Sequence, residues 1–403
     1  MWQKYLSPTT LDDTLRLLAQ HGSEARLVAG GTDLILEIES KLRQPSVLID
    51  ITRVYDLGRI TQTRDGVIHL GPLVTHSQVI ASRLIVENAF PLAQACWSVG
   101  TPQIRNRGTI AGNIVTASPA NDTITPLMAL GASVTLASVR GRRTVPLQDL
   151  LLSVREVAMA GDEMLVDIEF PAMRPDQHGM FIKFGLRRAL AISLVNVVAV
   201  VSLESGRIRK AAITLGSVAP TVIHAAQAEL LLTGECPSEE IIARAAEQAM
   251  QACRPIDDMR ASAAYRKELA RVVTARALRA AAAGREREGW SETPVVLWGK
   301  TDGHFPAGPA NTPVEHSSKG DELIEVTING ELHRIRGANH KTLIRLLRED
   351  AGLTGTKKPC AEGECGGCTV LLDGIAVLSC LVPAPRAHMA EIVTVEVLAQ
   401  DDR

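Results

Sequence analysis

Four of the seven cysteines in this 403-residue chain stand close together near its C-terminal end. Cys360, Cys365, Cys368 and Cys380 follow the spacing C-x4-C-x2-C-x11-C. A run of three closely spaced cysteines followed by a distant fourth is the plant-type signature for a [2Fe-2S] cluster, in which each iron takes two thiolates. The sequence therefore predicts one such cluster, held by a tight loop that the last cysteine closes.

The glycines between these cysteines support that prediction. Gly363, Gly366 and Gly367 allow backbone conformations that point amide groups inward toward sulfur. Two alternatives are a zinc site and a structural cysteine cluster, but zinc ligands usually form two C-x2-4-C pairs, and here only Cys365 and Cys368 are so close. A set of disulfides is disfavoured in a reducing cytoplasm. Three further cysteines, Cys96, Cys236 and Cys253, are isolated and are interpreted as small core residues.

Length and composition narrow the class of protein further. A chain of 403 residues exceeds what one hydrophobic core usually organises, so several domains are expected. A net charge of -2 provides no field that would attract nucleic acid. The longest apolar run, Leu190 to Leu203, contains Ser193 and Asn196, is too short for a membrane span and is interpreted as a buried strand. No secretory signal precedes the first strand, so we expect a cytoplasmic protein that binds neither nucleic acid nor membrane.

Hydrophobic periodicity predicts a multi-domain α+β chain. The segment 284–321 is rich in proline, glycine, serine and threonine without periodicity, which is typical of a linker. Strand patterns continue from Phe181 to Leu203, and Ala-rich helical patterns follow. The predicted organisation is a first domain at 1–175 with two α/β subdomains (about 1–55 and 56–175), an α+β domain at 176–283, a linker at 284–321 and a β-grasp domain at 322–403.

The β-grasp prediction rests on two hairpins. Asn329-Gly330 and Asp373-Gly374 each separate two apolar runs, and both dipeptides favour two-residue turns. A helix with Leu343, Leu346 and Leu347 on one face lies between the hairpins, and Glu391 to Leu398 is predicted to supply a fifth strand.

Two glycine-containing loops in the first domain could hold a dinucleotide. Leu27 to Leu34 runs from an apolar strand through Gly30-Gly31 into a helix, and such a turn presents N–H groups to an anion. A second loop, Thr101 to Asn113, offers small, amide and hydroxyl residues. Gly-Gly turns are usually structural, and Arg105 and Arg107 could equally be solvated charges. No G-x-G-x-x-G fingerprint is present, so a Rossmann site is excluded.

The region from Thr354 to Cys380 resembles the ferredoxin-like domain of the xanthine dehydrogenase and carbon monoxide dehydrogenase family. Residues 1 to about 283 resemble the FAD-binding subunit of the same molybdenum hydroxylases, through the two loops and Ile114 to Asp122. The chain departs from the family at three positions. Pro359 and Ala111 stand where glycine is common, and Ala191 stands where aspartate is common. The Ala111 methyl group is expected to press on the phosphate loop.

The resemblance implies one [2Fe-2S] cluster and FAD, and no residue is assigned a catalytic role. It assigns the cluster to the four cysteines named above. Outside the family match, Asp122 would be interpreted as a turn residue, Lys183 as a strand charge and Leu165 as a core residue. The flavin positions that it implies are Leu27, Val28, Ala29, Gly30, Gly31, Thr32, Asp33, Leu34, Thr109, Ile110, Ala111, Gly112, Asn113, Ser118, Asp122, Leu165 and Lys183.

The function implied by the resemblance is electron transfer in a molybdenum hydroxylase. Electrons would pass from a partner molybdenum–pterin subunit through the cluster to FAD, and then to NAD+ or another acceptor. One alternative is a free-standing NAD(P)H-dependent flavin and iron–sulfur reductase, and another is a scaffold protein without cofactors. Because no cysteine follows Cys380, a second family cluster is expected on another chain or on a longer form of this one.

Overall fold

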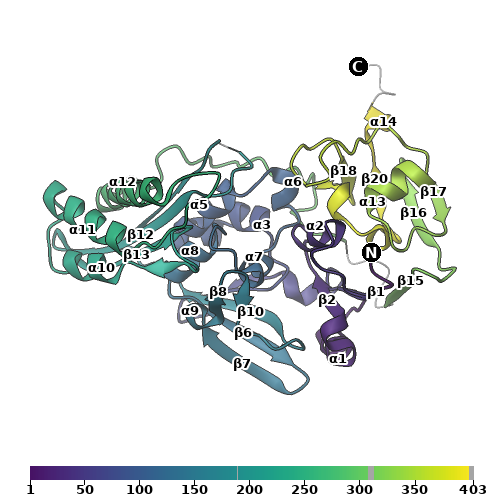
Figure 1. The fold of residues 1–403 in the computed structure, drawn as a ribbon, viewed down its shortest axis with the longest axis horizontal. Helices are drawn as coiled ribbons and strands as arrows, with labels where there is room; N and C mark the ends of the chain where they lie inside the picture. Colours follow the sequence, from purple (N-terminus) through teal and green to yellow (C-terminus); the bar gives the residue numbers. More distant parts are fainter. Residues whose placement is uncertain (188, 307–312, 399–403) are drawn as a thin grey trace.

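The computed structural model describes residues 1–187, 189–306 and 313–398, and they form four sheet-containing units (Figure 1). The expected α+β, multi-domain class is confirmed. The unit that contains helices α10 (Ala226–Leu232) to α12 (Ala263–Ala282) lies at one end of the elongated molecule and the unit that carries the clustered cysteines lies at the other, with the first two units between them (Figure 1).

The first unit is a four-stranded sheet in the order β15-β1-β3-β2. Its strands β1, β3 and β2 are parallel, and β15 pairs antiparallel with β1. The strand β15 lies within the segment 284–321 for which the sequence predicted a linker, so part of that segment completes the N-terminal sheet. The elements are β1 (Lys4–Ser7), α1 (Leu11–His21), β2 (Ala25–Val28), α2 (Leu34–Glu39), β3 (Val47–Asp50) and β15 (Val314–Ser317).

The second unit contains a five-stranded antiparallel sheet in the order β4-β5-β10-β6-β7, covered by helices that share one large core with it. The second of the two predicted flavin loops, Thr101 to Asn113, belongs to this helical layer. Its strands are β4 (Ile60–Gln62), β5 (Val67–Leu70), β6 (Ser133–Ser138), β7 (Gly141–Pro146) and β10 (Met164–Pro171), and a small ribbon pairs β8 (Leu151–Ser153) with β9 (Glu156–Val157). Its helices are α3 (His76–Ala81), α4 (Arg83–Asn88), α5 (Phe90–Ser98), α6 (Pro102–Arg105), α7 (Ile110–Thr116), α8 (Ile124–Ala129) and α9 (Leu147–Leu150).

The third unit packs helices against the antiparallel sheet β11-β12-β13-β14. The segment from Phe181 to Leu203, for which strands were expected, contains parts of two strands. The buried strand that was expected to begin at Leu190 begins at Val195. The elements are β11 (Gln177–Phe184), β12 (Val195–Glu204), β13 (Arg207–Gly216), β14 (Ile223–His224), α10 (Ala226–Leu232), α11 (Glu239–Ala252) and α12 (Ala263–Ala282).

The fourth unit is a mixed sheet in the order β17-β16-β20-β18-β19, with the expected hairpins at Asn329-Gly330 and Asp373-Gly374. All four of these turn residues have positive φ, as a two-residue type I′ turn requires. The final strand ends at Val393 and a short helix follows, which shortens the strand expected to reach Leu398. The elements are β16 (Ile324–Ile328), β17 (Glu331–Ile335), α13 (Leu343–Arg345), a π-helical turn (Leu346–Asp350), β18 (Thr369–Leu372), β19 (Ile375–Leu378), β20 (Glu391–Val393) and α14 (Val395–Leu398).

No helix in the described part of the chain is long and apolar enough to cross a membrane.

Candidate cofactor sites

The four clustered cysteines form two pairs of sulfur atoms. The Sγ atoms of Cys360 and Cys365 lie 3.2 Å apart, and those of Cys368 and Cys380 lie 3.3 Å apart. Because each iron of a [2Fe-2S] cluster takes two thiolates, the pairing fits the donor set of that cluster. The structure therefore brings together all four residues that the spacing singled out.

The two pairs differ in their surroundings. Cys368 and Cys380 are 2% and 4% exposed, whereas Cys365 is exposed. Burial alone would raise the pKa of the Cys360 thiol, but the N–H groups of Glu362 and Cys365 bond its sulfur and lower that pKa to about 7. The outer pair thus has amide donors in the loop, which favours the thiolate form that binds metal.

Pro359, a departure from the family pattern, packs against the glycine that precedes Cys368. A Cβ atom on Gly367 would lie 3.0 Å from Cγ of Pro359. The loop is further held by a hydrogen bond from the Lys357 N–H to the Gly367 carbonyl, 2.9 Å long. The proline ring therefore fills the space beside the loop, and a side chain at position 367 would have to displace it.

The first flavin loop leaves β2 after Val28 and enters α2 at Leu34. A Cβ atom on Gly30 would clash with the backbone carbonyl of Arg107, in the second loop, so only glycine fits there. Gly31 has a φ of 76°, the left-handed conformation that glycine adopts without strain. The two loops are thus in direct backbone contact.

Several backbone N–H groups in these loops have no acceptor within the described residues. They belong to Gly31, Thr32, Asp33 and Ala111. Phosphate groups bind at turns and helix starts where successive N–H groups remain unbonded. The donor set therefore fits the pyrophosphate of FAD.

The second loop is ordered by hydrogen bonds from its own polar side chains. Thr109 caps α7, with its Oγ1 accepting from the Gly112 N–H at 2.9 Å. The carbonyl and the side-chain oxygen of Asn113 accept from Asn121 at 2.6 Å and from Thr123 at 2.5 Å. Asn113 therefore fixes the turn that carries Ser118 and Asp122.

Asp122 and Lys183 form a buried ion pair, with Oδ2 of Asp122 2.6 Å from Nζ of Lys183. Ser193 and Asn196 donate to the other carboxylate oxygen, at 2.5 and 3.3 Å. Burial raises the pKa of Asp122, although Lys183 acts in the opposite direction. Ser193 and Asn196 were predicted only as interruptions of an apolar run, and two polar residues in a run that is otherwise buried are the signal that could have marked them.

Not every sequence-predicted flavin position lies at the surface of the site. The Ala111 methyl group packs into the core of the second unit. Leu165 lies in β10 and is 3% exposed. The positions whose side chains pack with hydrophobic cores are Leu27, Val28, Ala29, Leu34, Ile110, Ala111 and Leu165.

The buried cysteine pair adjoins the flavin loops. Cys368 and Cys380 share one apolar cluster with Leu36 of α2 and Ile104 of α6. On the other side of the cysteine loop, Glu364 pairs with Arg187 at 3.5 Å. Sequence reasoning missed Leu36 and Ile104, because nothing in their local pattern distinguishes them from ordinary core residues.

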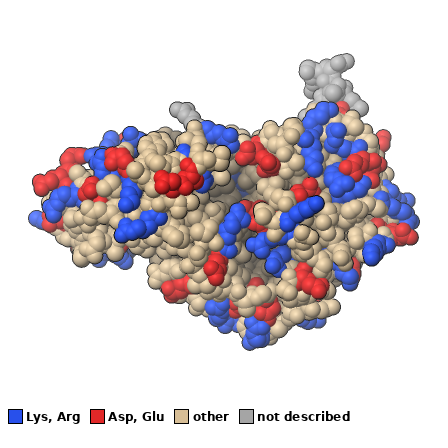
Figure 2. Space-filling view, viewed as in Figure 1, with Lys and Arg blue, Asp and Glu red and all other residues tan. Residues whose placement is uncertain are grey.

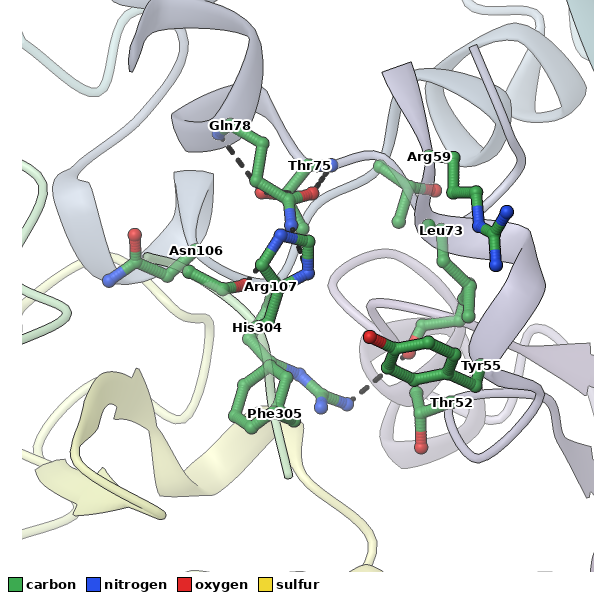
Figure 3. Close-up of a pocket in the computed structure, with 14 residues that line it drawn as sticks. Thr52, Tyr55, Arg59, Leu73, Thr75, Gln78, Asn106, Arg107, His304 and Phe305 are labelled. Atoms are coloured by element: carbon green, nitrogen blue, oxygen red, sulfur yellow. Dashed lines mark hydrogen bonds between the residues drawn. The ribbon is translucent and has the colours of Figure 1, made fainter. Parts of the chain in front are cut away.

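A cavity of about 260 Å³ is lined by residues of both flavin loops, among them Ala29 and Arg107 (Figure 3). Of the predicted flavin positions, only Ala29 and Thr109 line it. His304 and Phe305, from the segment that precedes β15, close one side, with the Phe305 ring beside the Arg107 guanidinium (Figure 3).

Charges of both signs are mixed over the face seen in Figure 2, and the face is hollowed between the two ends of the molecule. Both basic and acidic side chains border this hollow (Figure 2).

Three family descriptions match successive parts of the chain. Residues 2–173 match the FAD binding domain in molybdopterin dehydrogenase, residues 181–281 match the CO dehydrogenase flavoprotein C-terminal domain, and residues 326–390 match the 2Fe-2S iron–sulfur cluster binding domain.

Individual relatives match the flavoprotein part. The alpha subunit of the 6-hydroxypseudooxynicotine dehydrogenase complex of Paenarthrobacter nicotinovorans is 33% identical over 68% of this chain and 92% of its own length. The carbon monoxide dehydrogenase structure from Hydrogenophaga pseudoflava matches with a TM-score of 0.68 and 30% identity, covering 71% of this chain and 98% of that one. Quinoline 2-oxidoreductase from Pseudomonas putida 86 gives a TM-score of 0.67 at 29% identity, over 71% of this chain and 98% of that one.

Proposed function

This chain belongs to the molybdenum hydroxylase family and contains an FAD-binding domain and a [2Fe-2S] domain, and we propose that it passes electrons from a molybdenum–pterin subunit through its cluster to FAD. FAD exchanges electrons singly or in pairs and the cluster exchanges them one at a time, so together they link a two-electron oxidation to a one-electron relay. The proposed final acceptor is NAD+ or another electron acceptor, and the second relay cluster is proposed to reside on a separate chain or on a longer form of this one.

One observation carries this proposal. The peptide after the buried ligand Cys380 lies against the flavin loop, since the Leu381 carbonyl oxygen is 3.0 Å from where a Cβ atom on Gly31 would be. Short separation favours electron transfer between bound groups. The buried cysteine pair is therefore the side of the cluster suited to exchange electrons with the flavin.

The test uses the chain purified from its native cells together with whatever associates with it. We expect molybdenum to copurify, and substrate oxidation to reduce the bound flavin. Cys368→Ala should abolish this substrate-driven reduction, while NADH still reduces the flavin directly. Cys236→Ser is the matched control, because Cys236 is exposed and lies far along the chain from the cluster.

Two outcomes would reject the electron route. Flavin reduction by substrate that persists in Cys368→Ala would show that the cluster does not lie between molybdenum and FAD. An NADH-reducible protein that never associates with molybdenum would instead support the free-standing reductase.

A further inference from the structure

The segment 101–113 contacts two different parts of the molecule. Its C-terminal part, Thr109 to Asn113, belongs to the flavin site. Its N-terminal part contacts the ferredoxin-like domain, where Gln103 donates to the Thr369 hydroxyl at 3.2 Å and Ile104 joins the apolar cluster around Cys380. One short stretch of chain thus serves both the flavin and the cluster domain.

Asn106 makes the central contact between the domains. Its side chain is 2% exposed, and its Oδ1 accepts from the Ser77 hydroxyl at 2.6 Å within the flavin domain. Its Nδ2 donates to the carbonyl of Ala376 at 3.0 Å and to that of Leu297 at 3.3 Å. Ala376 belongs to the edge strand β19, and its N–H donates to the same Leu297 carbonyl at 2.9 Å.

Arg107 connects this contact to the first flavin loop. The guanidinium is buried and donates to the carbonyls of Gly30 at 3.2 Å and Ala29 at 3.3 Å. It also lies 5.5 Å from the centroid of Phe305, and Arg386 of the ferredoxin-like domain lies 5.2 Å from the same ring. Any displacement of Arg107 would therefore disturb the flavin loop and the domain junction together.

We propose that Asn106 and Arg107 are positioning residues that couple FAD binding to docking of the ferredoxin-like domain on its own chain. Binding free energies are reciprocal, so FAD that orders the 101–113 segment should strengthen docking, and docking should strengthen FAD binding by the same factor. The inference rests on the flavin occupying the two loops, but not on the identity of the electron donor or acceptor.

Hydrogen exchange at the Ala376 amide reports on the junction, because its N–H bonds the Leu297 carbonyl of the segment 284–321, and that same carbonyl accepts from Asn106 of the flavin domain. We expect FAD to slow exchange of the peptide that contains Ala376 on the order of tenfold, a usual size for coupling between two sites. In Asn106→Asp the carboxylate still accepts from Ser77 but cannot donate to Ala376 or Leu297. This variant should exchange quickly whether FAD is present or not, and should bind FAD more weakly by a similar factor.

Gln103→Leu provides a second variant should Asn106→Asp fail to fold, since it removes a single half-buried hydrogen bond and should weaken docking about fivefold. Asn88→Ala is the matched control, because its amide donates only to Leu84 within α4. The proposal would be overturned if FAD did not change the exchange rate of the Ala376 amide in the unaltered protein. It would also be overturned if FAD still slowed that exchange in both variants. Since the experiment needs no molybdenum subunit and no electron acceptor, failure of the proposed electron route would leave its result unchanged.

Discussion

The carbonyl oxygen of Leu381 lies 3.0 Å from the position that a Cβ atom on Gly31 would occupy. Leu381 follows the proposed cluster ligand Cys380 and Gly31 lies in the first proposed flavin loop, so this contact would join the two cofactor sites. A side chain at position 31 would meet Leu381 on one side and crowd the phosphates on the other. We therefore expect Gly31→Val to lower the FAD content of the purified protein, measured from extracted flavin.

Backbone strain contributes to the loss of FAD expected in Gly31→Val, and a substitution at a second glycine measures the contribution of strain alone. A branched side chain at a φ of 76° costs about 1–2 kcal/mol by itself. Gly66 has a φ of 87° and no atom within 4 Å of its Cβ position, so Gly66→Val carries similar strain without the contacts. An FAD content that is lowered to the same extent in the two variants would show that Gly31 is needed only for its conformation.

The thiolate pairs predict the metal content. We expect about two iron and two labile sulfide per chain, because four thiolates at this spacing hold one [2Fe-2S] unit. Cys365→Ser should remove most of the visible iron–sulfur absorbance, and Cys236→Ser should retain it. Full absorbance in Cys365→Ser would exclude Cys365 as a ligand.

The ion pair between Asp122 and Lys183 predicts a large effect on stability. Lys183→Met leaves a buried carboxylate without its cation, which should lower the free energy of unfolding by about 3–5 kcal/mol near neutral pH. Because burial already raises the pKa of Asp122 and loss of Lys183 raises it further, the carboxyl should take up a proton as the pH falls. The difference from the unaltered protein should therefore shrink toward acid pH in urea unfolding.

An exposed lysine provides the control for this measurement. Lys4 pairs with Glu315 at 3.8 Å on the surface, so Lys4→Met should cost at most about 1 kcal/mol. A loss in Lys183→Met that is equally small, or that does not change with pH, would contradict the buried ion pair.

His316 predicts a separate sensitivity to acid. It lies buried in β15 with its ring centroid 5.3 Å from that of His388, and burial, together with His388, lowers its pKa to about 4. As the pH falls below about 6.5, this histidine binds a proton in the unfolded chain but stays neutral in the folded chain. The free energy of unfolding should therefore fall by roughly 2–3 kcal/mol as the pH drops from about 6.5 to 4. His316→Phe keeps a ring but cannot titrate. A loss equally steep in this variant would show that His316 is not responsible.

Sequence patterns predicted those parts of the fold that depend on local chemistry. The type I′ turns at Asn329-Gly330 and Asp373-Gly374 follow from the low cost of positive φ in these residues, and the structure has hairpins at both. The strand β15 could not be found in this way, because a short edge strand beside proline-rich residues carries no periodicity. Its pairing with β1 depends on tertiary contact alone.

The candidate sites divide in the same manner. The cysteine spacing is a local signal, and it identified all four sulfur atoms that the structure brings together. The contact of Asn106 with Ala376 joins positions that are far apart in the sequence, and an asparagine between two arginines has no feature that would reveal it. Such contacts are decided by how the domains pack, which a single sequence does not encode in any short pattern.

The pairing of β1 with β15 has a consequence for how the protein is made. Lys4 lies opposite Ser317, so roughly 300 residues must leave the ribosome before β1 meets its partner, which takes about 15–60 s at 5–20 residues per second. During that interval the nascent chain presents the backbone edge of β1, and such an edge can recruit strands from other chains. Aggregation during synthesis should therefore depend on how quickly the distant β15 arrives to cover it.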